Sequence, residues 1–460
     1  MVTLFGLLQL NKRSLFSTQY ALQTINHNIA NMNEPGYSRQ DIIFRTAYPT
    51  ITAHGVLGNG VGVATVKRAT ADFYTRQLRR ETSNLGGWEM VSASLSEVES
   101  ILGEPNGNGL SDALNAFFEA WNDLAGDPES GAMRVAVIEA SNRLCQAFHS
   151  VDHALTQVVD NLNDQIASDV ERVNNLLKRI SDLNGQIVSI ESKDVKANDM
   201  RDERDELLLE LSKLINIEVK EDQYGSVDIY IGGTNVIHRT EARYLRVLDL
   251  STQAEKKLSI SLENDNSEIS VESGEIAGLL EARDTYMKDV RESIDNVASI
   301  IIQKVNEIHR RGWTPRGSGF DFFEGSDAET ISVSYAIQSD PDLVATSYDG
   351  TVGDNALAND IAALAETAIS EDDVRTINEL YNSIIASVGT YSRTAKDMVS
   401  NQELICENIE TKKDSIVGVN LDEELVKLTQ YQQSYEAAAR VMKVVESLVQ
   451  TIVDLPVGMY

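Results

Sequence analysis

The sequence predicts an α+β protein that is predominantly α, with terminal coiled-coil helices, a body of long helices and a small inserted antiparallel β region. Apolar residues recur at three- and four-residue spacing at both ends of the 460-residue chain and in its middle. Only 7 residues are proline, well below the usual share of about 5%. Between residues 215 and 274 the apolar period changes to two, which is typical of strands.

The first helix is predicted over residues 4–32. Its apolar residues fall on two rows of a heptad pattern, a coiled-coil seam with two polar positions that could fix its register. One row is Leu8, Leu15, Leu22 and Ile29, and the other is Leu4, Asn11, Thr18, Ile25 and Met32.

The last helix is predicted over residues 421–452 and repeats the pattern. Its rows are Leu421, Leu428, Tyr435, Met442 and Val449, and Tyr431, Ala438, Val445 and Ile452. A lone helix of this kind is marginal in water. We therefore expect the two terminal helices to pack on each other or on neighbouring subunits.

The interior pattern predicts a helical body interrupted once. A third apolar stripe runs from Leu162 to Ile190, with Asp169 where an apolar residue is due, and residues 201–214 continue as helix. A hairpin is expected around Tyr224–Gly225. Further strands are expected at residues 244–248, 258–262, 269–271 and 331–337, a glycine-rich loop at 312–325, and helices at 274–309 and from 354 onward.

These elements predict discontinuous, nested domains. The expected division is a terminal coiled-coil assembly domain (1–45 with 416–460), a helical body (46–214 with 275–415) and an inserted β-rich outer region (215–274).

Composition excludes several classes. The 40 basic and 71 acidic residues give a net charge of −31, which disfavours nucleic acid and anionic membranes as partners. Apolar runs are too short to span a bilayer, and Lys12–Arg13 follow rather than precede the first apolar residues, the reverse of a cleavable signal. Cys145 and Cys406 cannot form a disulfide framework. We expect a soluble protein without a cleavable secretion signal.

Signals for catalysis are weak. Residues 58–62 (GNGVG) lack the G-K-[ST] of a phosphate loop, so a turn feeding a strand is the better interpretation. Cys145, His149 and His153 share a helical stripe, yet the first and last would lie about 12 Å apart, too far for one metal ion. We predict no catalytic, metal or cofactor site; the alternative from another class is a metal-dependent enzyme using His149 and His153.

The N-terminal segment carries a recognisable motif. Residues 21–31 (ALQTINHNIAN) are followed by EPGYSRQ at 34–40. Pro35 ends the helix, Pro35–Gly36 suits the centre of a type II turn, and a strand can start near Ile43. The string resembles the A-L-x-x-x-[ST]-x-N-I-A-N and G-Y-x-R signature of bacterial flagellar axial proteins, the rod, hook and hook-associated family, with Asn26 at the Ser/Thr position.

Other stretches are similar to hook-associated members of that family. They are Gly60–Val63 with Arg68, RDERDELL at 201–208, Gly278–Leu280 with Arg283–Asp284, Asn306 and His309, VNLDEE at 419–424 and YQQSYEAAARV at 431–441. The resemblance points to a member at the hook–filament junction; a second junction protein or another hook or rod component is the alternative.

The resemblance implies a non-enzymatic protein without cofactors that is transiently cytoplasmic and is exported through the flagellar type III apparatus, with an export chaperone on its C-terminal helix. It implies self-assembly into a tube in the extracellular flagellum, between hook protein and a second junction protein. Added to the heptad rows above, the motif positions implied to serve assembly are Asn28, Asn31, Gly36, Tyr37, Arg39 and Gln433.

Charge is distributed unevenly between the ends. The first 45 residues hold four basic and two acidic side chains, a net charge of +2, whereas the last helix is acidic. We expect the two terminal helices to be a complementary pair.

Overall fold

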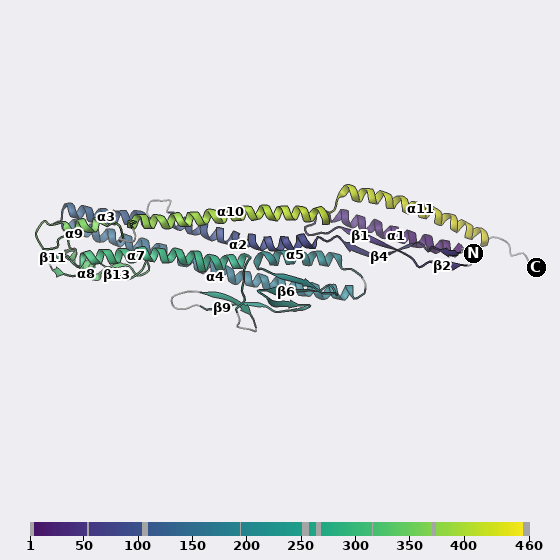
Figure 1. Cartoon of the computed structure of the whole chain (residues 1–460), viewed down its shortest axis with the longest axis horizontal. Helices are drawn as coiled ribbons and strands as arrows, with labels where there is room; N and C mark the ends of the chain where they lie inside the picture. The colour runs from purple at the N-terminus through teal and green to yellow at the C-terminus, as the bar shows by residue number, and fades with distance from the viewer. Residues whose placement is uncertain are drawn as a thin grey trace, which may run out of the picture.

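The computed structural model describes residues 4–52, 55–103, 109–193, 195–250, 257–263, 268–314, 316–369 and 374–453. It confirms the predicted class, because long helices dominate and the sheets are small and antiparallel. The molecule is elongated: the helices of the body lie along one axis, and the first and last helices of the chain lie side by side at one end of it (Figure 1).

The body is built from long helices packed side by side. α4, a single helix of 61 residues, contains the whole predicted stripe from Leu162 to Ile190. The predicted helix over 274–309 is interrupted by a π-helical turn. The helices are α2 (Asp72–Leu102), α3 (Leu110–Gly126), α4 (Gly131–Glu191), α5 (Asn198–Leu214), α6 (Glu275–Glu281), η1 (Ala282–Met287, π), α7 (Lys288–His309), α8 (Tyr335–Ser339), η2 (Pro341–Leu343, 3₁₀), α9 (Ala356–Ala363) and α10 (Ile377–Val417).

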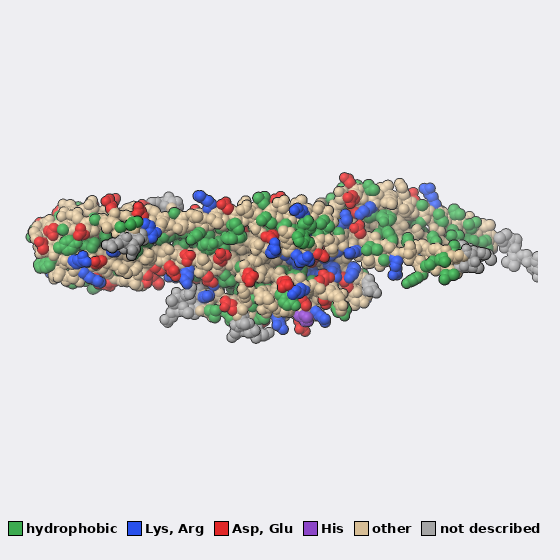
Figure 2. Space-filling model, viewed as in Figure 1, with side chains coloured by type: hydrophobic (Ala, Val, Ile, Leu, Met, Phe, Trp, Pro, Cys, Tyr) green, Lys and Arg blue, Asp and Glu red, His purple; other side chains and the backbone are tan. Residues whose placement is uncertain are grey.

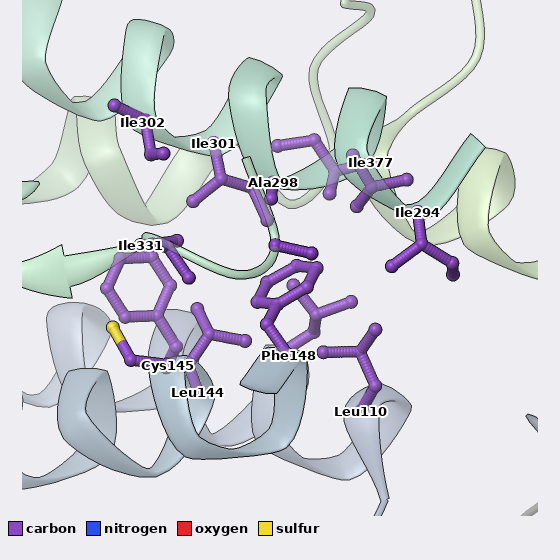
Figure 3. Close-up of a cluster of buried hydrophobic side chains, with 14 of the residues drawn as sticks. Leu110, Leu144, Cys145, Phe148, Ile294, Ala298, Ile301, Ile302, Ile331 and Ile377 are labelled. Atoms are coloured by element: carbon purple, nitrogen blue, oxygen red, sulfur yellow. The ribbon is translucent and has the colours of Figure 1, made fainter. Parts of the chain in front are cut away.

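The main hydrophobic core lies in the distal half of the body. Residues from α3, α4, α7 and the start of α10 meet there, as Figure 3 shows for Leu110, Phe148, Ile301 and Ile377. Phe148 and Ile301 are fully buried. The apolar side chains of this core are buried without any contribution from the terminal helices.

The loop after α7 closes over this core. Asn306 accepts from the backbone N–H of Phe322 and Phe323 and donates to the carbonyl of Phe323. Its strands are only two residues each: β11 (Trp313–Thr314), β12 (Gly317–Ser318), β13 (Phe323–Glu324) and β14 (Ser332–Val333). The predicted strand over 331–337 is wrong beyond Val333, because Gln338 N–H bonds to the Ser334 carbonyl and starts α8.

A second core joins the inserted β region to α4 and α5. The predicted hairpin is confirmed: β5 (Glu218–Glu221) pairs with β6 (Val227–Ile231). The sheet continues through β7 (Thr234–His238) and β8 (Glu241–Ala242), which were not predicted, and β9 (Leu245–Asp249) pairs with β10 (Leu258–Leu262). The predicted strand at 269–271 is wrong, since only Glu268 bridges to Ser261 before the chain turns toward α6.

Asp169 marks the boundary between the two cores along α4. Ile166 belongs to the distal core and Val170 to the β-region core. The Asp169 carboxylate is buried and bonds to Arg172 at 2.9 Å, while Arg172 also approaches Glu275. Burial raises the pKa of Asp169, and Arg172 opposes the shift. The gap in the predicted stripe is therefore an internal polar contact.

At the other end, α1 (Leu4–Ala30) packs along α11 (Leu421–Val453). β1 (Gln40–Thr46) pairs with β4 (Val61–Arg68) beside α1, and β2 (Thr50–Thr52) with β3 (Gly55–Leu57) forms a hairpin that was not predicted. The turn at 58–62 feeds a strand, as predicted. We refer to α1, β1–β4 and α11 as the terminal module; the expected boundary at residue 45 falls inside β1 and would separate this strand from its partner β4.

Candidate functional site: the joint between the terminal module and the body

The contact between α1 and α11 is more polar on the α1 side than the heptad rows suggested. Asn11 and Thr18, the two polar interruptions, are buried with Ala21 and Ile25. Each polar side chain bonds to the carbonyl four residues earlier in α1, Asn11 to Leu7 and Thr18 to Ser14. The row that begins at Leu8 is only half-buried.

The predicted assembly residues therefore divide by exposure. Buried are Ile25, Asn28, Ala438 and Val445; half-buried are Leu8, Leu15, Leu22, Ile29, Asn31, Tyr37, Arg39, Leu428, Tyr431, Met442 and Val449; exposed are Gly36, Leu421, Gln433, Tyr435 and Ile452. Tyr431 packs on Phe44 of β1 with ring centroids 6.2 Å apart. A second apolar stripe on α11, formed by Val441, Val444 and Leu448, is exposed.

After α1 the chain makes the predicted turn. The Tyr37 N–H bonds to the Glu34 carbonyl at 3.2 Å, and Gly36 adopts φ +75°. That angle is the one a type II turn requires at its third residue, which favours glycine. The turn directs Tyr37 and Ser38 back toward the end of α1 and toward α5.

Asn28 is the centre of the joint. Its side-chain NH2 donates to the Gln40 carbonyl (2.9 Å) and to Glu424 Oε2 of α11 (3.0 Å), and its Oδ1 accepts from Tyr37 OH (2.8 Å) and Gln40 N–H (2.9 Å). Asn28 and Glu424 are both buried. One amide thus ties α1, the turn, β1 and the start of α11 together, with all its hydrogen-bonding capacity used.

The electrostatic environment of the joint is acidic. Burial raises the pKa of the Tyr37 hydroxyl well above its ordinary value, and the carboxylates of Asp199, Asp202 and Glu424 raise it further. Tyr37 therefore stays protonated and remains a donor to Asn28.

The helix α5 receives the turn from the body side. Asp202 accepts from the Ser38 N–H (3.1 Å), and Asp199 accepts from the Gln40 side chain (2.6 Å). Arg68, at the end of β4, reaches both Asp202 and Asp205 at 2.6 Å. The N-terminal motif and the RDERDELL motif, more than 160 residues apart, thus meet in one polar network.

The two arginines of the same motif anchor α5 to the body. Arg201 bonds to Glu191 (2.6 Å) and Glu221 (2.8 Å). Burial would raise the pKa of Glu191, but hydrogen bonds from Arg201 and Lys196 lower it to about 2. The buried Arg204 donates to the Gly225 carbonyl (2.6 Å) and to Asn184.

The C-terminal crossing of the joint lies between α10 and α11. The Arg39 N–H bonds to the Val417 carbonyl at 2.7 Å, directly before the break at Gly418. Asn420 then caps α11 by accepting from the backbone N–H of Asp422 and Glu423. The chain therefore crosses the joint twice, once after α1 and once between α10 and α11, and the hydrogen bond from Arg39 to Val417 links the two crossings.

Sequence reasoning missed three members of this network: Gln40, Asp199 and Glu424. Glu424 carried a usable signal, since a charge occupies a heptad position four residues before Leu428. Gln40 lies at the end of the string EPGYSRQ but was not predicted as a site residue, and Asp199 carried no signal because its position breaks no pattern.

The residues of the metal alternative lie on successive turns of α4 and have different surroundings. Cys145 is buried, and burial raises the pKa of its thiol to about 12. His149 bonds to the Ile331 carbonyl, and His153 is exposed. Within the ranges that the structure describes, no three His, Cys, Asp or Glu side chains are grouped so as to hold a metal ion.

No helix within the described ranges combines the length and the apolar character that a bilayer crossing requires.

Fold and joint together define a class: an elongated helical subunit whose two chain ends form one module, fixed to its body by a polar network. Known proteins are similar to this chain in sequence. Residues 95–323 match the family described as "Flagellar hook-associated protein FlgK helical domain", and residues 415–455 match "Flagellar basal body rod FlgEFG protein C-terminal".

Relatives match over almost their whole length. "Flagellar hook-associated protein 1" of Bacillus subtilis (strain 168) is 26% identical over 500 residues, covering 99% of both chains. The Salmonella typhimurium protein of the same name is 26% identical over 542 residues, covering 96% of this chain and 98% of the relative. A solved structure, the flagellar hook junction protein FlgK from Burkholderia pseudomallei, matches with a TM-score of 0.65 at 11% identity, covering 74% of this chain and 100% of that one.

The chain belongs to the flagellar hook-associated protein 1 family. Proteins of this family are structural components of the extracellular flagellum and assemble in its axial structure.

Proposed function

We propose that this protein is a structural adaptor at the hook–filament junction, where its copies form a tubular zone between the hook protein and a second junction protein that carries the filament. The observation that carries the proposal is the terminal module. The first and last helices pack together in this module, and hydrogen bonds of the motif residues attach it to the body. Apolar side chains remain exposed on its surface.

The exposed apolar side chains support assembly through the ends. Val441, Val444 and Leu448 of α11 and Phe16 and Tyr20 of α1 are all exposed. Exposed apolar stripes of this kind mark surfaces that a partner covers. We propose that the predicted assembly residues, with this stripe, contact neighbouring subunits in the tube.

A deletion strain tests the adaptor role. We expect hooks of normal length, no filaments, and flagellin released into the medium; expression of the intact chain should restore filaments. Shortened rods or hooks would reassign the protein to a rod or hook component. Immunolabelling of purified flagella should place the chain at the hook–filament boundary, and labelling only on its filament side would indicate a second junction protein.

Before assembly the apolar stripe of Val441, Val444 and Leu448 would be exposed to water. We propose a cytoplasmic export chaperone on α11 and export through the flagellar type III apparatus. Replacing Val441, Val444 and Leu448 by serine should abolish chaperone capture while leaving the circular dichroism of the monomer unchanged. Unaltered capture would contradict this binding site.

The nested domain division is also a proposal, and limited proteolysis tests it. Terminal segments with exposed apolar faces and few neighbours open more easily than a closed core. We expect protease to trim the dilute monomer to about Arg45 and about Ser415. Ends that resist protease in the monomer would contradict a terminal module that is completed only by assembly.

A further inference from the structure

A basic patch interrupts the acidic surface of the body just beyond the joint. Residues 67–80 hold five basic side chains and one acidic, a net charge of +4 in a chain of −31. Arg68 forms ion pairs with Asp202 and Asp205 in the joint, and Arg80 forms one with Glu81. Figure 2 shows Lys and Arg side chains gathered over this part of the molecule, where α2 begins beside α5.

Two guanidinium groups of the patch lack a carboxylate partner. Within the described ranges, neither Arg76 nor Arg79 forms an ion pair. Burial lowers the pKa of Arg79, and the nearby Arg76 lowers it further. The carboxylates of Asp205 and Asp72 oppose this shift but do not cancel it. Phe73, in the turn before Arg76, is 64% exposed. An exposed aromatic ring beside unpaired arginines is the composition of a protein–protein contact.

The matching surface lies on α10. Residues 397–411 hold four acidic side chains and no basic one, a net charge of −4. Glu403 and Glu407 are exposed and form no ion pair within the described ranges. Leu404, between them, is 55% exposed. Both surfaces therefore have an apolar centre, and their charges are opposite. We call Glu403, Leu404 and Glu407 the acidic face.

The two surfaces lie at a similar height along the molecule. The Gln402 side chain donates to the Glu81 carbonyl (3.2 Å) and to Glu81 Oε2 (2.6 Å), which places the acidic face near the first turns of α2. α2 and α10 run side by side along the body (Figure 1).

They also point away from each other. Gln402 is buried against α2, and Leu404, two residues later, lies about 200° further round α10. On α2, Leu78 is buried on the side of Glu81, and Arg76 lies about 200° from it. Arg76 and Arg79 line a groove with Asp205 and with Glu410 near the end of α10, and no residue of the acidic face lines that groove, so contact between the patch and the acidic face requires a second copy.

We infer that the basic patch (Phe73, Arg76 and Arg79) of one copy docks on the acidic face (Glu403, Leu404 and Glu407) of the next copy around the tube. The inference rests on the proposed tubular assembly and adds a lateral contact between bodies to the contacts of the terminal module. The contact is heterologous, so it repeats from copy to copy around a closed or helical arrangement.

Cysteine cross-linking in assembled flagella tests the contact. The full-length chain with Cys406→Ser, Phe73→Cys and Leu404→Cys is expressed in the deletion strain, and purified hook–filament structures are treated with a short bismaleimide. We expect a ladder of covalent multimers of this chain. Each single cysteine, and Phe73→Cys combined with Glu203→Cys on the exposed face of α5, should give no ladder.

The outcomes separate the two proposals. Normal filaments that contain the chain with both introduced cysteines but give no ladder, or cross-links only to a different protein, would overturn the lateral contact and leave the adaptor role intact. Absence of the chain from the hook–filament boundary would overturn the adaptor role, and the lateral contact with it.

Charge reversal gives an independent readout. Arg76→Glu with Arg79→Glu should reduce filaments per cell about ten-fold or more, the factor that corresponds to about 1.4 kcal/mol. Adding Glu403→Lys and Glu407→Lys should restore them, because the pairing is re-formed with opposite signs. A monomer of unchanged circular dichroism whose loss is not rescued would contradict the pairing.

Discussion

The body and the terminal module bury their apolar stripes to very different extents. Along α4 the predicted stripe is closed, with Ile166, Val173 and Ile180 fully buried. Along α11 the predicted rows are only partly covered, since Ala438 and Val445 are buried but Leu421, Tyr435 and Ile452 are exposed. The second stripe of α11, Val441, Val444 and Leu448, remains 46%, 60% and 49% exposed. The same periodicity in the sequence thus serves a self-contained core in one region and an open surface in the other.

The joint between these regions is polar rather than apolar. Asn28, Ser38 and Asp202 meet there through hydrogen bonds of defined geometry. Hydrogen bonds fix direction more strongly than apolar contact does, because their energy falls steeply with angle. The joint therefore holds the open module at a set orientation on the closed body.

The largest expected effect lies in the closed core. Phe148→Ala should lower the free energy of unfolding of the monomer by about 3–5 kcal/mol, because it removes a fully buried aromatic ring and leaves a cavity. Chemical denaturation followed by circular dichroism measures it. Met133→Ala, on the exposed face of the same helix, is the control, and equal losses for the two variants would contradict the closed core.

A smaller effect is expected at the joint. Asn28→Ala removes four hydrogen bonds and leaves Glu424 with one donor fewer, a cost of about 1–3 kcal/mol. Asn28→Asp should cost more, since an oxygen would face the Glu424 carboxylate and the Gln40 carbonyl. Hydrogen exchange should accelerate at Ser38–Gln40 and remain unchanged in α7. Acceleration spread evenly over both regions would show that the joint is not a local element.

The distal core should also respond to pH through His309. This ring accepts from the Ala345 N–H and bonds to the Phe320 carbonyl, and burial lowers its pKa below the ordinary value. Below about pH 6.5 the unfolded chain binds a proton that folded His309 does not. The free energy of unfolding therefore falls as pH drops below about 6.5, by at most about 1.4 kcal/mol per pH unit, down to the lowered pKa.

Denaturation at a series of pH values tests this dependence. His309→Asn should be less stable at neutral pH but should lose stability less steeply between about pH 6.5 and 5. His153→Ala, an exposed histidine of α4, is the control and should follow the parent chain. Parallel curves for the parent and His309→Asn would rule out a contribution from His309.

The sequence predicted what depends on periodicity and local turn chemistry. The stripes of α4 and α11, the Pro35–Gly36 turn and the hairpin at Tyr224–Gly225 all lie where the pattern placed them. The short strands β2, β3, β7 and β8 were missed because two to five residues are too few to establish a period.

The candidate site was only partly predictable, for a different reason. The N-terminal signature and the RDERDELL motif were both recognised, yet no local rule pairs Ser38 with Asp202 or Asn28 with Glu424 across 164 and 396 residues. The heptad row of α1 that contains Asn11 and Thr18 is a similar case: by polarity these residues interrupt the row, but their side chains bond to carbonyls of their own helix and can therefore be buried.

The smallest effect on the monomer is expected where the apolar surface is open, and it is the sharpest test of the comparison. Val444→Ser exchanges an exposed apolar side chain for a polar one, so the free energy of unfolding of the monomer should change by no more than about 0.5 kcal/mol. If a neighbouring copy covers Val444 in the tube, filament number should nevertheless fall, because burying an unpartnered hydroxyl at the contact costs about 1–3 kcal/mol. Val135→Ser, at an exposed valine near the start of α4, is the matched control. A large loss of monomer stability from Val444→Ser would mean that α11 is already closed before assembly, and the contrast between the two regions would not hold.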